Sequence, residues 1–272
     1  MKESHKKVKV VVAGASGRMG MTILRLAHED HGLQIVGAFE RAGHPAIGRD
    51  IGELIGADTL QVPVNENLVS CVEAGQVVID FTHPDAVQEN LAVALKTRKS
   101  LVIGTTGLSK STLAKIKSAS NHIAIVQSPN MSVGVNLLFR LASLVAKTLD
   151  DRYDVEIVEE HHRHKKDAPS GTALELGRVI AAARGVKFEK STVYGRKGIT
   201  GTRRRGEIGI HALRGGDTVG LHTASFIADG ERVELVHRAS SREAFAMGAL
   251  LAAKFVAKKK TGIYNMQNVL GL

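Results

Sequence analysis

Short apolar runs alternate with amphipathic segments along the first half of the chain. Such runs, rich in Val and Ile, are typical of strands that are buried on both faces of a sheet. They occupy residues 8–13, 33–39, 76–81, 101–104 and 123–126. Segments with a helical spacing of apolar residues lie between them, at residues 21–29, 65–74, 84–97 and 109–119. This alternation predicts an α/β fold of the Rossmann type, a doubly wound parallel sheet with helices on both faces.

The pattern changes in the second half of the chain. A long helix is predicted at residues 133–149, followed by a strand at 153–158 and a helix at 173–183. Longer segments that alternate in polarity then predict strands at 207–213, 218–227 and 232–237. The glycine turns 215–217 and 229–231 between these strands are typical of hairpins. We therefore expect a smaller α+β domain with an open mixed sheet in which antiparallel pairs prevail.

Two further segments affect the predicted domain organisation. An amphipathic helix at 242–258 is expected to pack back on the first domain. Residues 186–205 are predicted to be a solvated loop, and the alternative for its Arg203-Arg204-Arg205 cluster is a contact with a phosphate or a subunit. The predicted domains are thus 1–131 with 242–272, for dinucleotide binding, and 132–241, for substrate binding and oligomerisation.

A glycine-rich turn joins the first predicted strand to the first predicted helix. Its sequence is Gly14-Ala15-Ser16-Gly17-Arg18-Met19-Gly20. This GxxGxxG spacing is a variant of the GxGxxG fingerprint of dinucleotide-binding proteins. Gly14 would permit the tight turn, Gly17 the approach of a pyrophosphate, and Gly20 close packing of the helix. The pyrophosphate would lie at the helix N-terminus, where unpaired N–H groups point outward.

Charged residues at the end of the second strand support cofactor binding. Glu40 lies at the distance past the glycines where an acidic group binds the adenosine ribose. Arg41 follows it directly, and Arg18 lies in the turn, so a guanidinium group is available for a 2′-phosphate. The site is therefore predicted to accept both NADH and NADPH. Taken singly, each of these residues is equally typical of a charged strand end.

Composition narrows the class of protein. The 272 residues are 43% apolar, which is enough for a sizeable core, and the formal net charge is +10. That charge suits nucleic acid or anionic small molecules, but aromatic residues make up only 4% of the chain and Trp is absent, which disfavours single-stranded nucleic acid. The single Cys71 fits a reducing cytosol. The apolar run that follows the basic start is too short for a signal peptide. We therefore expect a cytoplasmic protein without membrane or nucleic-acid partners.

Residues 159–173 carry the densest cluster of candidate chemistry. Three histidines, an arginine and two lysines precede a Pro-Ser-Gly-Thr turn that opens the helix at 173–183. Cations that face a helix N-terminus predict a site for an anion that needs a proton; the alternative is a solvated basic loop. His161 is the candidate acid, with Glu160 beside it to help hold its proton. A metal site is not expected, because HExxH spacing and cysteine pairs are absent from the sequence.

At these motifs the chain resembles the 4-hydroxy-tetrahydrodipicolinate reductase family, also called dihydrodipicolinate reductase. The resemblance covers nearly the whole chain, and the His-His-Arg loop is its most specific part. The motifs that carry it are Gly14 to Gly20, Asp80-Phe81-Thr82, Gly104-Thr105-Thr106-Gly107, Asn130-Met131-Ser132-Val133-Gly134, the segment from Glu159 to Ala173, and Ala239-Ser240-Ser241-Arg242. The basic leader, residues 1–7, and Arg203–Arg205 belong to none of them.

The resemblance implies an enzyme that reduces a cyclic imine dicarboxylate with NADH or NADPH, in the diaminopimelate and lysine pathway, as a homotetramer. It implies that His161 is the acid/base group and Lys165 a second proton donor. The residues implied in binding substrate carboxylates are His162, Ser170, Gly171 and Thr172. Those implied in lining the cofactor are Gly14, Ala15, Ser16, Gly17, Arg18, Met19, Gly20, Glu40, Arg41, Gly104, Thr105, Thr106, Ser128, Pro129, Asn130 and Met131.

Two alternative functions are open at this point. One is a non-catalytic dinucleotide sensor that binds DNA or a partner through its basic surface. The other is an amino-acid dehydrogenase with a similar two-domain build. Neither the preference between NADH and NADPH nor the choice between the hydroxylated substrate and its dehydrated product follows from the sequence.

Overall fold

The computed structural model describes residues 6–272, and the chain divides into two compact units. Unit 1 consists of Met1–Val133 and Arg242–Gly271, and unit 2 of Gly134–Ser241. The basic leader at residues 1–7 lies largely outside the described residues. None of the helices in the described part of the chain is long and apolar enough to cross a membrane.

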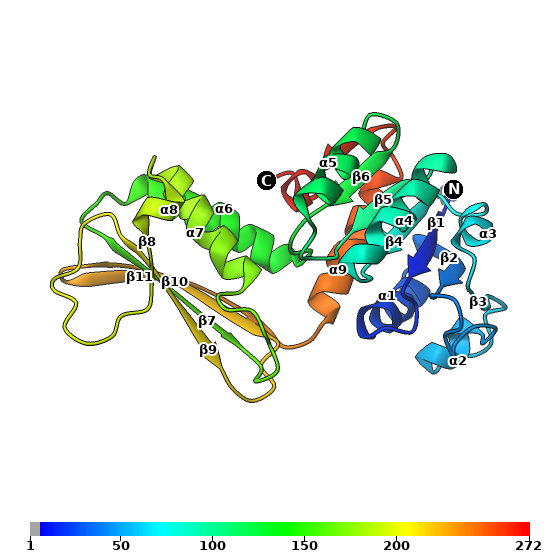
Figure 1. Ribbon diagram of the computed structural model, residues 1–272, viewed down its shortest axis with the longest axis horizontal. Helices are drawn as coiled ribbons and strands as arrows, with labels where there is room; N and C mark the ends of the chain where they lie inside the picture. The colour runs from blue at the N-terminus through cyan, green and yellow to red at the C-terminus, as the bar shows by residue number, and fades with distance from the viewer. Residues whose placement is uncertain (1–5) are drawn as a thin grey trace, which may run out of the picture. The chain divides into compact units, whose positions relative to one another are not determined.

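Unit 1 is built on a parallel sheet that, within residues 6–272, has seven strands (Figure 1). From one edge to the other they are β12 (Gly262–Tyr264), β6 (Ala124–Gln127), β5 (Ser100–Ile103), β4 (Val77–Asp80), β1 (Val8–Ala13), β2 (Leu33–Phe39) and β3 (Val64–Asn65). The order reverses between β1 and β4, as in Rossmann folds, and ligands of such sheets bind at that reversal, beyond the carboxyl ends of the strands. The predicted fold class is confirmed.

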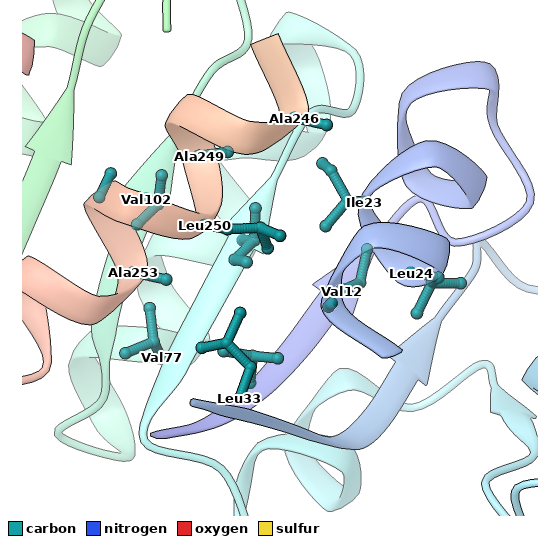
Figure 2. Close-up of a cluster of buried hydrophobic side chains, with 14 of the residues drawn as sticks. Val12, Ile23, Leu24, Leu33, Val77, Val102, Ala246, Ala249, Leu250 and Ala253 are labelled. Carbon is teal, nitrogen blue, oxygen red and sulfur yellow. The ribbon is translucent and has the colours of Figure 1, made fainter. Parts of the chain in front are cut away.

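Helices cover both faces of this sheet because successive residues of its strands point to opposite sides. Val10 and Val12 of β1 join the core under α1 (Arg18–Glu29) and α9 (Glu243–Val256). Val11 of the same strand joins the opposite core. The helices on that side are α3 (Leu68–Val72), α4 (Pro84–Lys96) and α5 (Lys110–Ala119). Figure 2 shows Ala246, Ala249 and Ala253 of α9 in the buried cluster that this helix forms with α1 and the sheet, and these small side chains allow close packing.

Unit 2 holds a mixed sheet with helices on one face. In order, its strands are β11 (Glu231–Ala239), β10 (Gly220–Ala228), β7 (Asp154–His161), β9 (Ile208–Arg214) and β8 (Thr192–Tyr194). The central strand β7 pairs antiparallel with β10 and parallel with β9. Its residues Val155 and Ile157 are buried under α6 (Val133–Thr148) and α7 (Gly171–Ala183). The predicted open mixed sheet is confirmed.

The order of these strands corrects one of the two predicted hairpins. The turn at Asp229-Gly230 does join neighbouring antiparallel strands, with Ala228 opposite Glu231 and Gly230 at φ 87°. The turn at 215–217 does not, because β7 lies between β9 and β10. Among the described residues, this sheet therefore has as many parallel as antiparallel strand pairs, whereas an excess of antiparallel pairs was expected. A glycine turn predicts a reversal of the chain but not which strands become neighbours.

Several short elements escaped the sequence patterns. The predicted loop at 186–205 contains α8 (Phe188–Ser191) and the edge strand β8. Unit 1 contains β3, β12, α2 (Ile51–Ile55) and α10 (Met266–Leu270), none of which was predicted. Elements of two to five residues are too short to show a period, and they form here through pairing with a longer neighbour or through a cap, such as the one that Asp50 provides to Gly52 N in α2.

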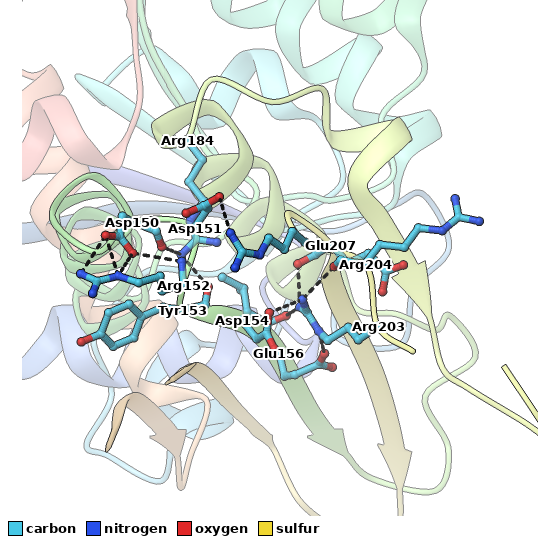
Figure 3. A network of polar contacts seen from close by, with 12 residues as sticks. Asp150, Asp151, Arg152, Tyr153, Asp154, Glu156, Arg184, Arg203, Arg204 and Glu207 are labelled. Atoms are coloured by element: carbon cyan, nitrogen blue, oxygen red, sulfur yellow. Dashed lines mark hydrogen bonds and ion pairs between the residues drawn. The ribbon is translucent and has the colours of Figure 1, made fainter. Parts of the chain in front are cut away.

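The predicted solvated cluster at Arg203–Arg205 is also partly wrong. The Arg203 guanidinium is half-buried and donates to Asp154 Oδ1 (2.6 Å), to Glu156 Oε1 (3.0 Å) and to the carbonyl oxygens of Val155 and Glu207. Figure 3 shows this side chain turned toward the strands while Arg204 points away. Arg203 thus anchors the segment before β9 to the sheet.

Candidate active site

The glycine-rich turn of unit 1 has the geometry that an anion site at a helix N-terminus requires. Gly14 has φ 71°, and the N–H groups of Gly14 and Ala15 both donate to Phe39 O, at 2.9 and 3.1 Å, so the turn is fixed to the end of β2. A Cβ on Gly20 would lie 2.0 Å from Gly14 O, so only glycine lets α1 start here. Helix α1 has no side-chain cap at Gly17 and no acidic residue in its first turn. Its first N–H groups therefore suit an anion.

Glu40 at the end of β2 is bound to this turn. Its Oε1 accepts from Ser16 N (3.0 Å) and Ser16 Oγ (2.6 Å), and its side chain is largely buried. His44 Nε2 lies 3.4 Å from the same hydroxyl, while His44 Nδ1 accepts from Ala46 N. No sequence pattern points to His44, because its contact depends on the path of the loop after β2. Arg41 is exposed beside this group.

Other strand ends of unit 1 are joined by a buried carboxylate. Asp80, at the end of β4, accepts from Thr82 N (2.9 Å), Thr82 Oγ1 (2.6 Å), Thr105 Oγ1 (3.2 Å) and Asn90 Nδ2 (2.8 Å). It therefore fixes the loops after β4 and β5 together. A Cβ on Gly104 would lie 2.1 Å from the Phe81 ring, so the loop after β5 needs glycine at this place.

Some residues implied in lining the cofactor have buried side chains. Ala15 and Met131 belong to the core beside α1 and α9, so only their backbone atoms remain for a ligand. Ser128 is also buried, and its hydroxyl donates to Asn130 O (2.9 Å). Gly17, Arg18, Thr106 and Pro129 are exposed, and Met19 is half-buried.

In unit 2, His161 ends strand β7 and its partner is Glu159, not the adjacent Glu160. His161 Nδ1 lies 2.5 Å from Glu159 Oε2, whereas Glu160 accepts from Thr218 Oγ1 at 2.7 Å. The predicted role of Glu160 is therefore wrong. Neighbouring residues of a strand point to opposite faces, so the residue that meets His161 is two positions away.

The Glu159 carboxylate is held by four hydrogen bonds. Besides His161 it accepts from Ser170 N (2.9 Å) and from both terminal nitrogens of Arg214 (2.8 and 2.9 Å). Burial by itself would raise the pKa of Glu159, but the hydrogen bonds from His161, Arg214 and Ser170 outweigh it and hold the pKa at about 2. The group is a carboxylate at neutral pH, although none of its side chain is exposed.

The start of α7 adjoins this group through Ser170. This residue caps the helix, since its Oγ accepts from Ala173 N at 3.2 Å, and the same hydroxyl lies 3.1 Å from His222 Nε2. The first turn of α7 contains no acidic residue, and Gly171 is exposed. The helix N-terminus and the His161 imidazole are thus linked through two residues, Ser170 and Glu159.

The other residues predicted in the loop lie around this centre. Lys165 is partly buried, and its Nζ pairs with Asp167 at 2.9 Å. His162 N donates to Thr218 O (2.8 Å), and the His162 ring lies 6.2 Å from that of His164. Thr172 is half-buried on α7. Within residues 6–272, no three His, Cys, Asp or Glu side chains are grouped so that they could hold a metal ion.

The sequence patterns missed Glu159, Arg214 and His222. Glu159 could have been found, because it lies in phase with the buried Val155 and Ile157 on β7. Arg214 and His222 give no such signal, since β9 and β10 bring them beside β7 from more than fifty residues away.

Two family models match the chain almost end to end. The model "Dihydrodipicolinate reductase, N-terminus" matches residues 8–131, and "Dihydrodipicolinate reductase, C-terminus" matches residues 134–270. The chain belongs to the dihydrodipicolinate reductase family. The family predicted from the sequence is thereby confirmed, and so is the prediction of a reductase over a sensor or an amino-acid dehydrogenase.

Individual relatives agree with membership of the dihydrodipicolinate reductase family. The 4-hydroxy-tetrahydrodipicolinate reductase of Syntrophus aciditrophicus is 47% identical, over 97% of this chain and 98% of its own length. That of Anaeromyxobacter dehalogenans is 50% identical with the same coverage. Among solved structures, the dipicolinate-bound dihydrodipicolinate reductase of Paenisporosarcina sp. TG-14 has a TM-score of 0.76 at 27% identity, covering 96% of this chain and 99% of that one. An amine dehydrogenase from Mycobacterium smegmatis shares the fold alone, with a TM-score of 0.59 at 16% identity.

Proposed function

We propose that this reductase converts 4-hydroxy-tetrahydrodipicolinate to tetrahydrodipicolinate with NADH or NADPH, in diaminopimelate and lysine biosynthesis. Its curated relatives bear the name of that substrate, and the related solved structure holds dipicolinate, a planar dicarboxylate. The observation that carries the proposal is the Glu159–His161 pair at the end of β7, joined through Ser170 to the start of α7. A protonatable imidazole beside a helix N-terminus suits an anionic substrate that must receive a proton.

The loops of unit 1 fit a nicotinamide dinucleotide. The first N–H groups of α1, free of a side-chain cap, suit its pyrophosphate, and Gly14, Gly17 and Gly20 leave the space that the fingerprint requires. Glu40 and Arg41 lie where the adenosine ribose and a 2′-phosphate would be recognised. The segments Gly104–Thr106 and Ser128–Met131 line the rest of the site. When bound, the cofactor supplies a hydride.

The chain's own side chains supply the proton and hold the substrate. Reduction of the hydroxylated substrate consumes one hydride and one proton and releases one water molecule. His161 is the acid/base group, and Lys165 is the second donor, released from Asp167 to meet a substrate carboxylate or its ring nitrogen. His162, Ser170, Gly171 and Thr172 bind the carboxylates. The net charge of +10 favours capture of such a dianion in the cytoplasm, and the active form is a homotetramer.

The test is turnover of a His161→Ala variant with substrate generated in situ. Loss of the general acid is expected to lower kcat roughly 10²- to 10⁴-fold, while NADH binds as before. His164→Ala, which changes an exposed histidine three residues away, is the matched control and should retain kcat. Equal loss of turnover and of NADH binding in His161→Ala would overturn the role assigned to His161.

A further inference from the structure

A buried carboxylate occupies a core position of β7 directly before the reacting end of the strand. Residues 155, 157, 159 and 161 all face the core under α6 and α7, and the residues before Glu159 in this row are apolar. A carboxylate at such a position is costly unless it is fully paired. The contacts that offset this cost come from the His161 ring, from Ser170 N and from both terminal nitrogens of Arg214.

Arg214 is placed by the register of the sheet to share this carboxylate. It lies opposite His161 on β9 and binds Glu159 through two parallel hydrogen bonds of 2.8 and 2.9 Å. Two parallel bonds from a planar guanidinium fix the plane of the carboxylate, so Oε2 can meet His161 Nδ1 in one direction only.

His222 closes the group from the other neighbouring strand. It lies opposite Glu159 on β10, and its ring meets that of His161 edge-on, with 5.2 Å between centroids. Burial lowers the pKa of His222 to about 3, with a smaller contribution from the charge of His161, so this ring is neutral at working pH. His222 therefore packs against the His161 ring without adding a charge. The charged groups around His161 are Glu159, Arg214 and Lys165.

We propose that Glu159 and Arg214 form a positioning pair for His161. An ionised carboxylate can only accept hydrogen bonds, so Glu159 requires the proton of His161 to lie on Nδ1 and leaves Nε2 for the substrate. Arg214 orients the carboxylate and offsets part of its charge. This inference rests on the proposed function, because it assigns the pair to the residue that acts there as acid.

The pair predicts opposite pH effects for its two members. The Glu159 carboxylate attracts a positive charge on the His161 ring, whereas the Arg214 guanidinium, opposite His161 on β9, repels it. An acid loses activity as pH rises through its pKa. Without the Glu159 charge the basic limb of kcat should therefore move to lower pH, and without the Arg214 charge it should move to higher pH. A role in packing alone would not give shifts of opposite sign.

The experiment measures kcat against pH, with the substrate generated in situ, for Glu159→Gln and Arg214→Gln. Glu159→Gln preserves the shape of the side chain and should lower kcat roughly 10²-fold, part of the full contribution of a general acid, with the KM for NADH unchanged. Glu160→Gln is the matched control: it changes the adjacent residue on the opposite face, which binds Thr218, and should leave the basic limb in place.

Two outcomes separate this inference from the proposed function. If His161→Ala loses turnover but neither glutamine variant moves the basic limb, the positioning pair is refuted and the acid role stands. If His161→Ala retains turnover, the acid role is refuted and the pair with it. Should either glutamine variant fail to fold, proton NMR of the unaltered enzyme provides the test. The Nδ1–H of His161 should give a downfield resonance typical of a proton shared with a carboxylate, and absence of that resonance would refute the pair.

Discussion

Two of the three glutamates on strand β7, Glu156 and Glu159, have partners of the same kinds but lie at different places in the fold. Glu156 is bound by Arg196 (2.9 Å), Arg203 (3.0 Å) and His211 (2.7 Å), and Glu159 by Arg214 and His161. Burial would raise the pKa of both carboxyl groups, yet the hydrogen bonds from arginine and histidine hold each at about 2. By composition and by electrostatics the two clusters are alike.

The two clusters differ in their burial and in the parts of the fold that they contact. The side chain of Glu156 is 19% exposed on the face away from α6 and α7, and its arginines belong to the segment before β9. Gly209 lies opposite it on β9, and a Cβ there would overlap the carboxylate. Glu159 is fully buried, and its contacts lead to the end of the strand and the start of α7. A Glu–His–Arg cluster is therefore not evidence of catalysis by itself. Its place in the fold decides whether it can take part in the reaction.

The largest expected effect separates stability from turnover in the Glu156 cluster. Arg203→Ala removes the hydrogen bonds that this guanidinium donates to Glu156, to Asp154 and to two carbonyl oxygens, while Glu156 keeps Arg196 and His211. Breaking a buried ion pair by removing one partner costs about 3 to 5 kcal/mol. In the Arg203–Glu156 pair each side chain is 19% exposed, which places the expected loss at the lower end, about 3 kcal/mol. Urea unfolding should show this loss, while kcat at a temperature where the variant is folded stays unchanged.

Arg204→Ala is the matched control for this substitution, since its side chain is exposed, and it should leave the free energy of unfolding nearly unchanged. The comparison between the two clusters fails if Arg203→Ala lowers kcat as much as Glu159→Gln does. In that case the Glu156 cluster would also support the reaction.

Acid should weaken both clusters in the same range of pH. Each carboxyl group has a pKa lowered from an ordinary value of 4.5 to about 2 in the folded protein. The stability that each provides is complete above pH 4.5 and is lost as pH falls from 4.5 to about 2, because the unfolded chain binds the proton first. The loss is on the order of 3 kcal/mol for each group. Urea unfolding at pH 6, 4.5 and 3 measures the part of this loss that falls above pH 3.

Glutamine at either position should reduce, by a similar amount, the change in the free energy of unfolding with pH. Glu156→Gln and Glu159→Gln each remove one titrating group, so the free energy of unfolding should fall less between pH 4.5 and pH 3 than in the unaltered protein. An unaltered slope in one variant would show that its carboxylate is not held at a low pKa, and the electrostatic likeness of the clusters would be lost.

The fold was accessible from the sequence where the signal was local. Val and Ile runs predicted the buried strands of unit 1, and the place of His161 and Lys165 at a strand end beside a helix start followed from the same patterns. Strands such as β3 and β12, of two and three residues, exist only through pairing with β2 and β6, and no local signal encodes them.

The partners in the candidate site were less accessible for the same reason. Adjacency in the sequence favours Glu160 as the partner of His161, but side chains alternate along β7 and Glu159 shares the face of His161. The predicted hairpin at 215–217 makes β9 and β10 neighbours, but β7 lies between them. The contacts that Arg214 and His222 make beside β7 therefore could not be predicted. Motif and period locate a site; sheet order supplies its neighbours.

The smallest expected effect concerns Ser170, which links the Glu159 cluster to α7. Ser170→Ala removes a helix cap and the hydroxyl beside His222, but leaves the backbone N–H that donates to Glu159. Losing the cap costs about 1 kcal/mol, and burial of His222 without its partner adds to this. Ser109→Ala is the matched control, because Ser109 caps α5 at an exposed position. The excess loss of stability in Ser170→Ala over Ser109→Ala measures the contact with His222. If the two losses are equal, the hydroxyl only caps α7, and the Glu159 cluster extends to the helix through the backbone alone.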